Sequence, residues 1–176
     1  WFAENLRTEG YRNGDQIPSS LTDEEWESTI AGAMSVFGDS SFLCNDDSPY
    51  FDACNPDLSL IEYGRLYNWY SVIDQRALCP YGWHIPSDDE WTLLIDYLGI
   101  EAENYMKATY GWNYDNNGSN ESGFSGLPGG FRDNTGYFAS AGSQGIWWSN
   151  TQPTDGTAWS RRLHDYYSGV GRYGNN

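Results

Sequence analysis

Basic residues are scarce in this chain. Nine lysines and arginines stand against 25 aspartates and glutamates, which gives a formal net charge of −16 at pH 7 and a sequence pI of about 4.1. Such an excess of negative charge repels phosphate backbones, so the composition disfavours nucleic-acid binding. Lys107 is the only lysine, which excludes most lysine-based chemistry.

Long apolar runs are missing as well. No stretch approaches the roughly 20 apolar residues of a membrane-spanning helix, and the mean hydropathy is −0.68. Aromatic residues nevertheless make up 17% of the chain, and disordered chains are poor in such core-forming rings. A length of 176 residues is typical of one domain with one core. We therefore expect a single folded domain without a membrane span.

Cysteine is limited to three residues. Cys44 and Cys54 flank a short polar segment that reads as a loop, and a disulfide there would stabilise the fold by roughly 2–3 kcal/mol. The alternative is two free buried thiols, whereas zinc is disfavoured because no CxxC spacing occurs. We expect the disulfide and a location outside the cytoplasm. Cys79 is then left over, as a reactive thiol or as a cysteine whose partner is missing.

Helix signals concentrate in the first hundred residues. Thr22 with Glu25, and Ser87 with Glu90, have the spacing of capping boxes that open helices. Apolar residues recur at helical spacing after Ser87, and Gly99 is a stop signal. A similar spacing lies between the two capping boxes. The predicted helices are 23–32, 65–74 and 88–98.

The amino-acid pattern changes from about residue 108 onward. Glycines recur every few residues, and short apolar or aromatic runs alternate with polar loops. The predicted strands are 123–127, 137–139, 146–149 and 159–163. Helices followed by a small irregular antiparallel β region predict an α+β domain rather than a parallel one. Trp147 and Trp148, as neighbours on a strand, must point to opposite faces.

Catalytic and metal-binding patterns are weak. No Ser-His-Asp set is legible, no glycine-rich loop leads into a helix, and His84 lies in a motif that favours a hydrogen-bonded structural role. The oxygen-rich segments 45–47 and 115–117 are either solvated loops or Ca²⁺ ligands. They lack the spacing of an EF-hand, so calcium stays open and no other cofactor is expected.

The C-terminal stretch 150–176 has the composition of a recognition surface. Tyrosine, arginine and tryptophan supply large contact areas with few rotatable bonds, and glycine, serine and asparagine supply adaptable loops. The alternative is that these aromatics pack the β region, with Leu163 and Trp159 the strongest candidates for the core. The candidate ligand-binding residues are Trp159, Arg161, Arg162, His164, Tyr166, Tyr167, Arg172 and Tyr173. At least one of Arg161 and Arg162, together with Tyr166, Tyr167 and Tyr173, is expected to be exposed on one face away from the helices.

Five motifs in a fixed order carry a resemblance to a known family. They are WFAENL (1–6), YGRLYNWY (63–70), LCPYGWHIPSDDEW (78–91), GFSGLPGGFR (123–132) and GIWWSNT (145–151). Together they resemble the major paralogous domain of Fibrobacter succinogenes, which is also abundant in surface proteins of Bacteroidetes. The resemblance implies a C-type-lectin-like fold, shared in outline with formylglycine-generating enzymes and the variable proteins of diversity-generating retroelements.

Both ends of the chain depart from that family. Members usually begin slightly upstream of WFAENL and end in a strand whose cysteine would be the natural partner of Cys79. We therefore expect residues 1–176 to be one domain that lacks flanking segments, an internal or mature piece of a longer protein.

Binding is the function that these features favour. We expect a non-enzymatic extracellular or cell-surface adhesion module that recognises a protein or glycan through its C-terminal loops. The alternative is a structural module that contacts other subunits of a surface or filamentous assembly. An oxidoreductase of the formylglycine-generating type is less favoured, because those enzymes need late cysteines and none follows Cys79.

Overall fold

The structure is a computed structural model that describes residues 4–39, 44–46, 48–154 and 156–175. Short helices and several small sheets make an α+β domain. The helices are α1 (Asp23–Ser28), α2 (Pro56–Tyr63), α3 (Trp69–Val72), α4 (Asp88–Leu98) and α5 (Ala102–Met106). The strands are β1 (Met34–Ser35), β2 (Cys44–Asp46), β3 (Leu66–Tyr67), β4 (Gly129–Arg132), β5 (Phe138–Ala141), β6 (Gln144–Trp148), β7 (Ala158–His164) and β8 (Gly171–Asn175).

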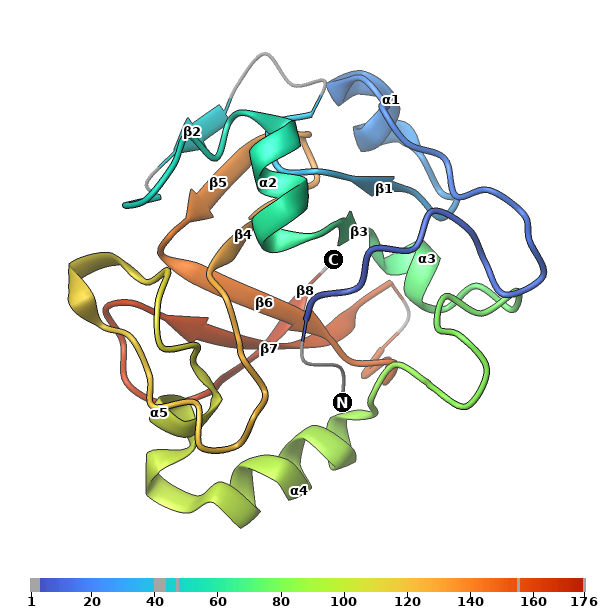
Figure 1. Cartoon of the computed structure of the whole chain (residues 1–176). Helices are drawn as coiled ribbons and strands as arrows, with labels where there is room; N and C mark the ends of the chain where they lie inside the picture. Colours follow the sequence, from blue (N-terminus) through green and yellow to red (C-terminus); the bar gives the residue numbers. More distant parts are fainter. Residues whose placement is uncertain (1–3, 40–43, 47, 155, 176) are drawn as a thin grey trace.

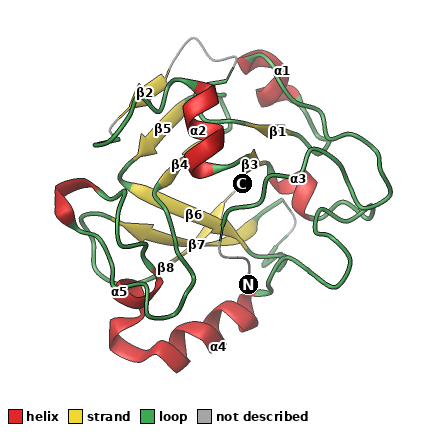
Figure 2. Cartoon of the chain, in the orientation of Figure 1, coloured by secondary structure: helices red, strands yellow, loops and turns green. Residues whose placement is uncertain are grey.

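Three sheets organise these strands. β6, β7 and β8 form an antiparallel meander, β4 and β5 form a hairpin with β2 parallel to β5, and β1 pairs with β3. β4 lies beside β6, so the two larger sheets adjoin (Figure 2). Figure 1 shows β6 and β7 across the middle of the molecule, with α4 and α5 below them and α1 and α2 at the opposite end, at the top. α5 and nearly all of α4 lie in the second half of the chain, and the short strands β1, β2 and β3 lie in the first half. Helices and strands are therefore less separated along the chain than the sequence predicts.

Both predicted capping boxes are present. The Thr22 hydroxyl accepts from Glu25 N at the start of α1, and the Ser87 hydroxyl accepts from Glu90 N at the start of α4. α4 ends at Gly99, whose φ of 69° is a conformation that favours glycine. α1 is shorter than the predicted 23–32, because Thr29 is already extended and the chain turns away toward β1.

The predicted helix 65–74 is wrong over its first half. Leu66 and Tyr67 pair with β1, and helix begins only after Asn68. The Asn68 side chain accepts from Ala33 N at 2.9 Å and from Ser71 N at 3.0 Å, and it donates to Ala31 O at 2.9 Å. One amide therefore caps α3 and also fixes the strand beside it. The apolar spacing could not reveal this long-range contact.

Two helices, α2 and α5, were not predicted from the sequence. α2 begins with Asn55 as its cap and Pro56 in its first turn, a local signal that was available in the sequence. α5 has no capping side chain, so it carries no such signal. Among the predicted strands, residues 123–127 form only an isolated bridge, between Gly126 and Lys107.

Buried residues form three clusters. Phe37, Tyr63 and Phe138 centre one cluster, Tyr11 and Ile17 a second, and Trp91, Met106, Trp112 and Leu163 the third. Trp147 and Trp148 point to opposite faces of β6, as expected. The Trp147 ring packs edge-on against Phe124 in the third cluster, whereas Trp148 packs on Trp69 and donates from Nε1 to Tyr67 O at 2.8 Å. The two indoles thus join β6 to different layers.

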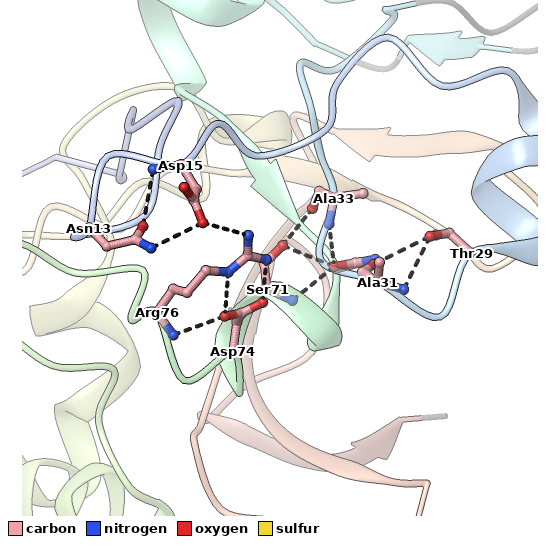
Figure 3. A network of polar contacts seen from close by, with 9 residues as sticks. Asn13, Asp15, Thr29, Ala31, Ala33, Ser71, Asp74 and Arg76 are labelled. Atoms are coloured by element: carbon pink, nitrogen blue, oxygen red, sulfur yellow. Dashed lines mark hydrogen bonds and ion pairs between the residues drawn. The ribbon is translucent and has the colours of Figure 1, made fainter.

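A surface network of polar contacts holds the N-terminal loop (Figure 3). Arg76 forms two hydrogen bonds with the Asp74 carboxylate, at 2.9 and 2.7 Å, and a third with Asp15 Oδ2 at 3.2 Å. Its guanidinium lies 4.0 Å from the centre of the Tyr11 ring. The hydrogen bonds from Arg76 lower the pKa of Asp74 to about 2.

The cysteines follow the expected pairing. Cys44 and Cys54 form a disulfide that joins β2 to the turn before α2, and Cys79 is a free, buried thiol. Burial raises the pKa of Cys79. None of the described helices is long and apolar enough to cross a bilayer. A disulfide and the lack of such a helix are compatible with secretion.

Candidate functional site: the β7–β8 hairpin and its loop

Alternate residues of β7 face two different layers. Leu163 is fully buried in the cluster around Trp91, and Arg161, two residues earlier, is buried beside α4. Trp159 is half-buried on the same side, where Arg172 of β8 stacks 3.8 Å from its ring centre. Leu163 is therefore a core residue, as the alternative interpretation held, and Trp159 is a platform for Arg172.

Arg161 and Arg172 meet at one carboxylate. Asp88, at the start of α4, lies 2.7 Å from Arg161 Nη1 through one oxygen and 2.6 Å from Arg172 Nη2 through the other. Arg161 also donates to Thr92 Oγ1 at 3.0 Å. It is only 2% exposed, and burial lowers its pKa while Asp88 opposes that change. Arg161 is not an exposed ligand contact; its role is to fasten β7 and β8 to α4.

Arg162 and Tyr173 lie on the other side of the hairpin. The Arg162 guanidinium is 4.5 Å from the centre of the Tyr173 ring, and burial lowers the pKa of Arg162. Tyr173 is about half exposed. The Tyr173 ring is therefore partly open to solvent, on the side of the hairpin opposite to Asp88.

Two tyrosines project from the loop between β7 and β8. Tyr166 is 77% exposed and Tyr167 is 66% exposed, and their rings meet edge-on with centroids 5.4 Å apart. The His164 ring, at the end of β7, packs edge-on against Tyr167 at 5.0 Å. Three candidate residues therefore form one continuous aromatic cluster, which we call the tyrosine loop (residues 164–167).

Hydrogen bonds on both sides hold the tyrosine loop in place. Asp165 N donates to Ser143 O at 2.8 Å, and the Asn116 amide donates to Asp165 O. Beyond the tyrosines, Gly169 N donates to Glu103 Oε2 on α5. The other Glu103 oxygen pairs with Lys107, which is buried against the Trp112 ring. The rings are thus exposed on a backbone that is fixed at both ends.

The oxygen-rich segments have structural uses where they are described. Asn116 supports the tyrosine loop, and Asn117 Oδ1 accepts from Trp112 N at 3.1 Å. Asp47 and the Asp46 side chain lie outside the described residues, so the calcium prediction for 45–47 cannot be followed there. Within the described chain, no three His, Cys, Asp or Glu residues group as a metal site would require.

His84 has the structural role expected of it. Its Nε2 lies 2.9 Å from Glu90 Oε1, the carboxylate that completes the capping box of α4. Hydrogen bonds from Ser87, and then from His84, lower the pKa of Glu90. The histidine therefore reinforces a helix start.

An apolar cleft was not foreseen from the sequence. It measures about 1760 Å³, its lining includes the rings of Trp69, Trp83, Trp148 and Tyr97, and Cys79 is in its wall. These residues come from segments far apart in the chain, so no local pattern announces the cleft.

Comparison with known proteins yields one family. No curated protein and no solved structure matches the chain. The model of one family, described as the Fibrobacter succinogenes major domain, matches residues 1–173. Because that match spans nearly all 176 residues and agrees with the five ordered motifs, the chain belongs to the Fibrobacter succinogenes major domain family.

Proposed function

We propose that this domain is a non-enzymatic binding or adhesion module that recognises a protein or glycan through the tyrosine loop. The observation that carries the proposal is the pair of exposed rings, Tyr166 and Tyr167, on a backbone anchored at Asp165 and Gly169. Rigid aromatic side chains bury large areas on binding at a small cost in conformational entropy. Tyr173, on the neighbouring strand, is a further ring that is about half exposed.

The proposed location is the outside of the cell, in a C-type-lectin-like fold. The Cys44–Cys54 disulfide supports an oxidising compartment, and the acidic composition suits solubility there. The α+β architecture supports the fold that the family resemblance implies. Chemistry of the formylglycine-generating type is disfavoured, because Cys79 is buried with a raised pKa and a thiol is reactive as its thiolate.

A glycan array on the isolated domain tests the recognition role. We expect wild-type protein to bind a subset of glycans, and replacement of Tyr166 and Tyr167 by alanine to weaken that binding by about 1–2 kcal/mol per ring. The melting temperature should stay nearly unchanged, because both rings are exposed. Tyr81→Ala is the matched control, since Tyr81 is 83% exposed and its ring contacts Arg12, outside the tyrosine loop. If the double variant unfolds, or binds as wild type does, the tyrosine loop is not the recognition site.

The second candidate is a structural module of a surface assembly. The apolar cleft and exposed apolar residues outside the tyrosine loop favour it, since large exposed apolar patches mark protein contacts. Light scattering on the same sample separates the two functions. A concentration-dependent oligomer without glycan binding would support the assembly role.

A further inference from the structure

The outer face of α4 carries a row of exposed apolar side chains. Leu93 is 71% exposed, Tyr97 is 85% exposed, and Ile100, just beyond the helix, is 99% exposed. Leu93 and Tyr97 are four residues apart, which places them on one side of the helix, and Ile100 follows in the short turn after Gly99, where the helix has ended. Figure 1 shows α4 at the rim of the molecule, with the β6–β8 sheet on one side only. We call these three residues the α4 row.

The α4 row is separate from the packing that holds α4 in place. Trp91 and its partly buried neighbours Leu94, Ile95 and Leu98 occupy the opposite side, where they join the third cluster. The row therefore adds nothing to the core, and water surrounds three large apolar side chains. Contiguous exposure of this kind marks an interaction site. Leu93 and Tyr97 also form part of the rim of the apolar cleft.

Carboxylates surround the α4 row. Asp89 and Asp96 lie on the same exposed side of the helix, and Glu101 follows at its end. Within the described chain none of these three is ion-paired, and α4 itself contains no lysine or arginine. The nearby arginines, Arg161 and Arg172, are held by Asp88 on the inner side. The C-terminal end of the helix dipole adds further negative potential near Asp96.

We propose that the α4 row docks an amphipathic helical segment of another protein, one that carries lysine or arginine beside its apolar face. The apolar side chains of that segment cover Leu93, Tyr97 and Ile100, and its cations pair with Asp89, Asp96 and Glu101. A second copy of this chain fits poorly, because it would bring the same carboxylates together in a protein of net charge −16. The site is independent of the tyrosine loop.

The test uses two synthetic helical peptides of the same leucine pattern, one with lysine and one with glutamate at its polar positions. Fluorescence anisotropy should show that the Leu-Lys peptide binds at least 10-fold more tightly than the Leu-Glu peptide, and less tightly as salt rises. Leu93→Ser with Tyr97→Ser should weaken the Leu-Lys peptide at least 10-fold. Asp89→Asn with Asp96→Asn should weaken it several-fold and flatten its salt dependence.

Ile61→Ser is the matched control. Ile61 is 67% exposed on α2, and Arg7 donates to its carbonyl, so it is an exposed apolar residue on a helix with a cation beside it. This variant should bind the Leu-Lys peptide as wild type does. An equal loss in Ile61→Ser would mean that the peptide binds exposed apolar side chains without preference for the α4 row and would overturn the proposal, as would equal binding of the Leu-Glu peptide. If the wild-type protein forms an oligomer and Leu93→Ser with Tyr97→Ser makes it monomeric, the row binds a second copy of this chain, and the proposal is overturned.

Discussion

Two arginine–aspartate networks in this domain have the same chemistry and different surroundings. In the first, Asp88 joins Arg161 and Arg172 between α4 and the β7–β8 hairpin, with the Arg161 side chain 3% exposed and that of Asp88 9% exposed. In the second, Arg76 joins Asp74 and Asp15 at the surface, where its side chain is 39% exposed. Burial therefore decides what each network contributes, because water and salt screen the exposed charges.

The buried network also explains how a recognition-like composition can be structural. Arginine and tryptophan gather in β7 and β8, but Arg161, Arg172 and Trp159 are used to fasten the hairpin. The tyrosines of the intervening loop have no such partner on α4, and they project into solvent. Composition alone does not separate these two roles. The distinction comes from one carboxylate, Asp88.

Removal of that carboxylate should have the largest effect on stability. Asp88→Ala leaves two arginines without their shared partner, one of them buried, and should lower the free energy of unfolding by about 3–5 kcal/mol. Urea denaturation measures this change. Asp89→Ala is the control, because Asp89 is the exposed neighbour in the same first turn and should cost less than about 1 kcal/mol. Similar losses in both variants would show that the helix dipole, not the network, matters.

Loss of Glu103 should be the next largest effect. Glu103→Ala removes the partner of buried Lys107 and the acceptor of Gly169 N, and we expect the free energy of unfolding to fall by about 2–4 kcal/mol. Amide hydrogen exchange should accelerate at Gly169 more than in β7. Glu101→Ala, an exposed change nearby, should leave both readouts unaltered. Unchanged exchange at Gly169 would mean that the loop does not depend on this anchor.

The surface network should matter least, and only at the right pH. The pKa of Asp74 is about 2 in the folded protein, against about 3.9 for an unperturbed aspartate. Because the folded-state pKa is depressed, this stabilisation is fully present above about pH 4 and is lost as pH falls through about 2. Asp74→Asn should therefore lower the melting temperature slightly at pH 5.

The difference between this variant and wild type should be much smaller at pH 2, where Asp74 is largely protonated in the unfolded chain and about half protonated in the folded one. Thermal melts at pH 5, 4, 3 and 2 provide the comparison, with Asp96→Asn as an exposed control, since Asp96 forms no ion pair with an arginine among the described residues. A difference between Asp74→Asn and wild type that is as large at pH 2 as at pH 5 would contradict the assigned pKa.

Local signals account for the correct part of the sequence analysis. The capping boxes at Thr22 and Ser87, and the opposite directions of Trp147 and Trp148, depend on residues a few positions apart. The Cys44–Cys54 bond likewise closes a short polar segment. Interactions of short range leave a readable pattern, and the α+β class followed from their order.

Long-range contacts account for the errors. Arg161 was predicted to contact a ligand, because its partner, Asp88, lies 73 residues earlier in the chain and no spacing rule connects the two residues. The start of α3 was misplaced because Asn68 binds the backbone of Ala31 and Ala33, 37 and 35 residues away. In the candidate site, the exposure of Tyr166 and Tyr167 agreed with the composition, whereas the anchor at Glu103 had no signal in the sequence.

The burial of Lys107 allows unfolding of the domain to be followed through the chemical reactivity of this one side chain. The only lysine side chain in the chain is 1% exposed, between Glu103 and the Trp112 ring. An acylating reagent that attacks amines should therefore leave this side chain unmodified until the structure around α5 opens. Mass spectrometry of the peptide that contains Lys107, over a denaturant series, then counts open molecules without any added dye. Rapid acylation under native conditions would contradict its burial.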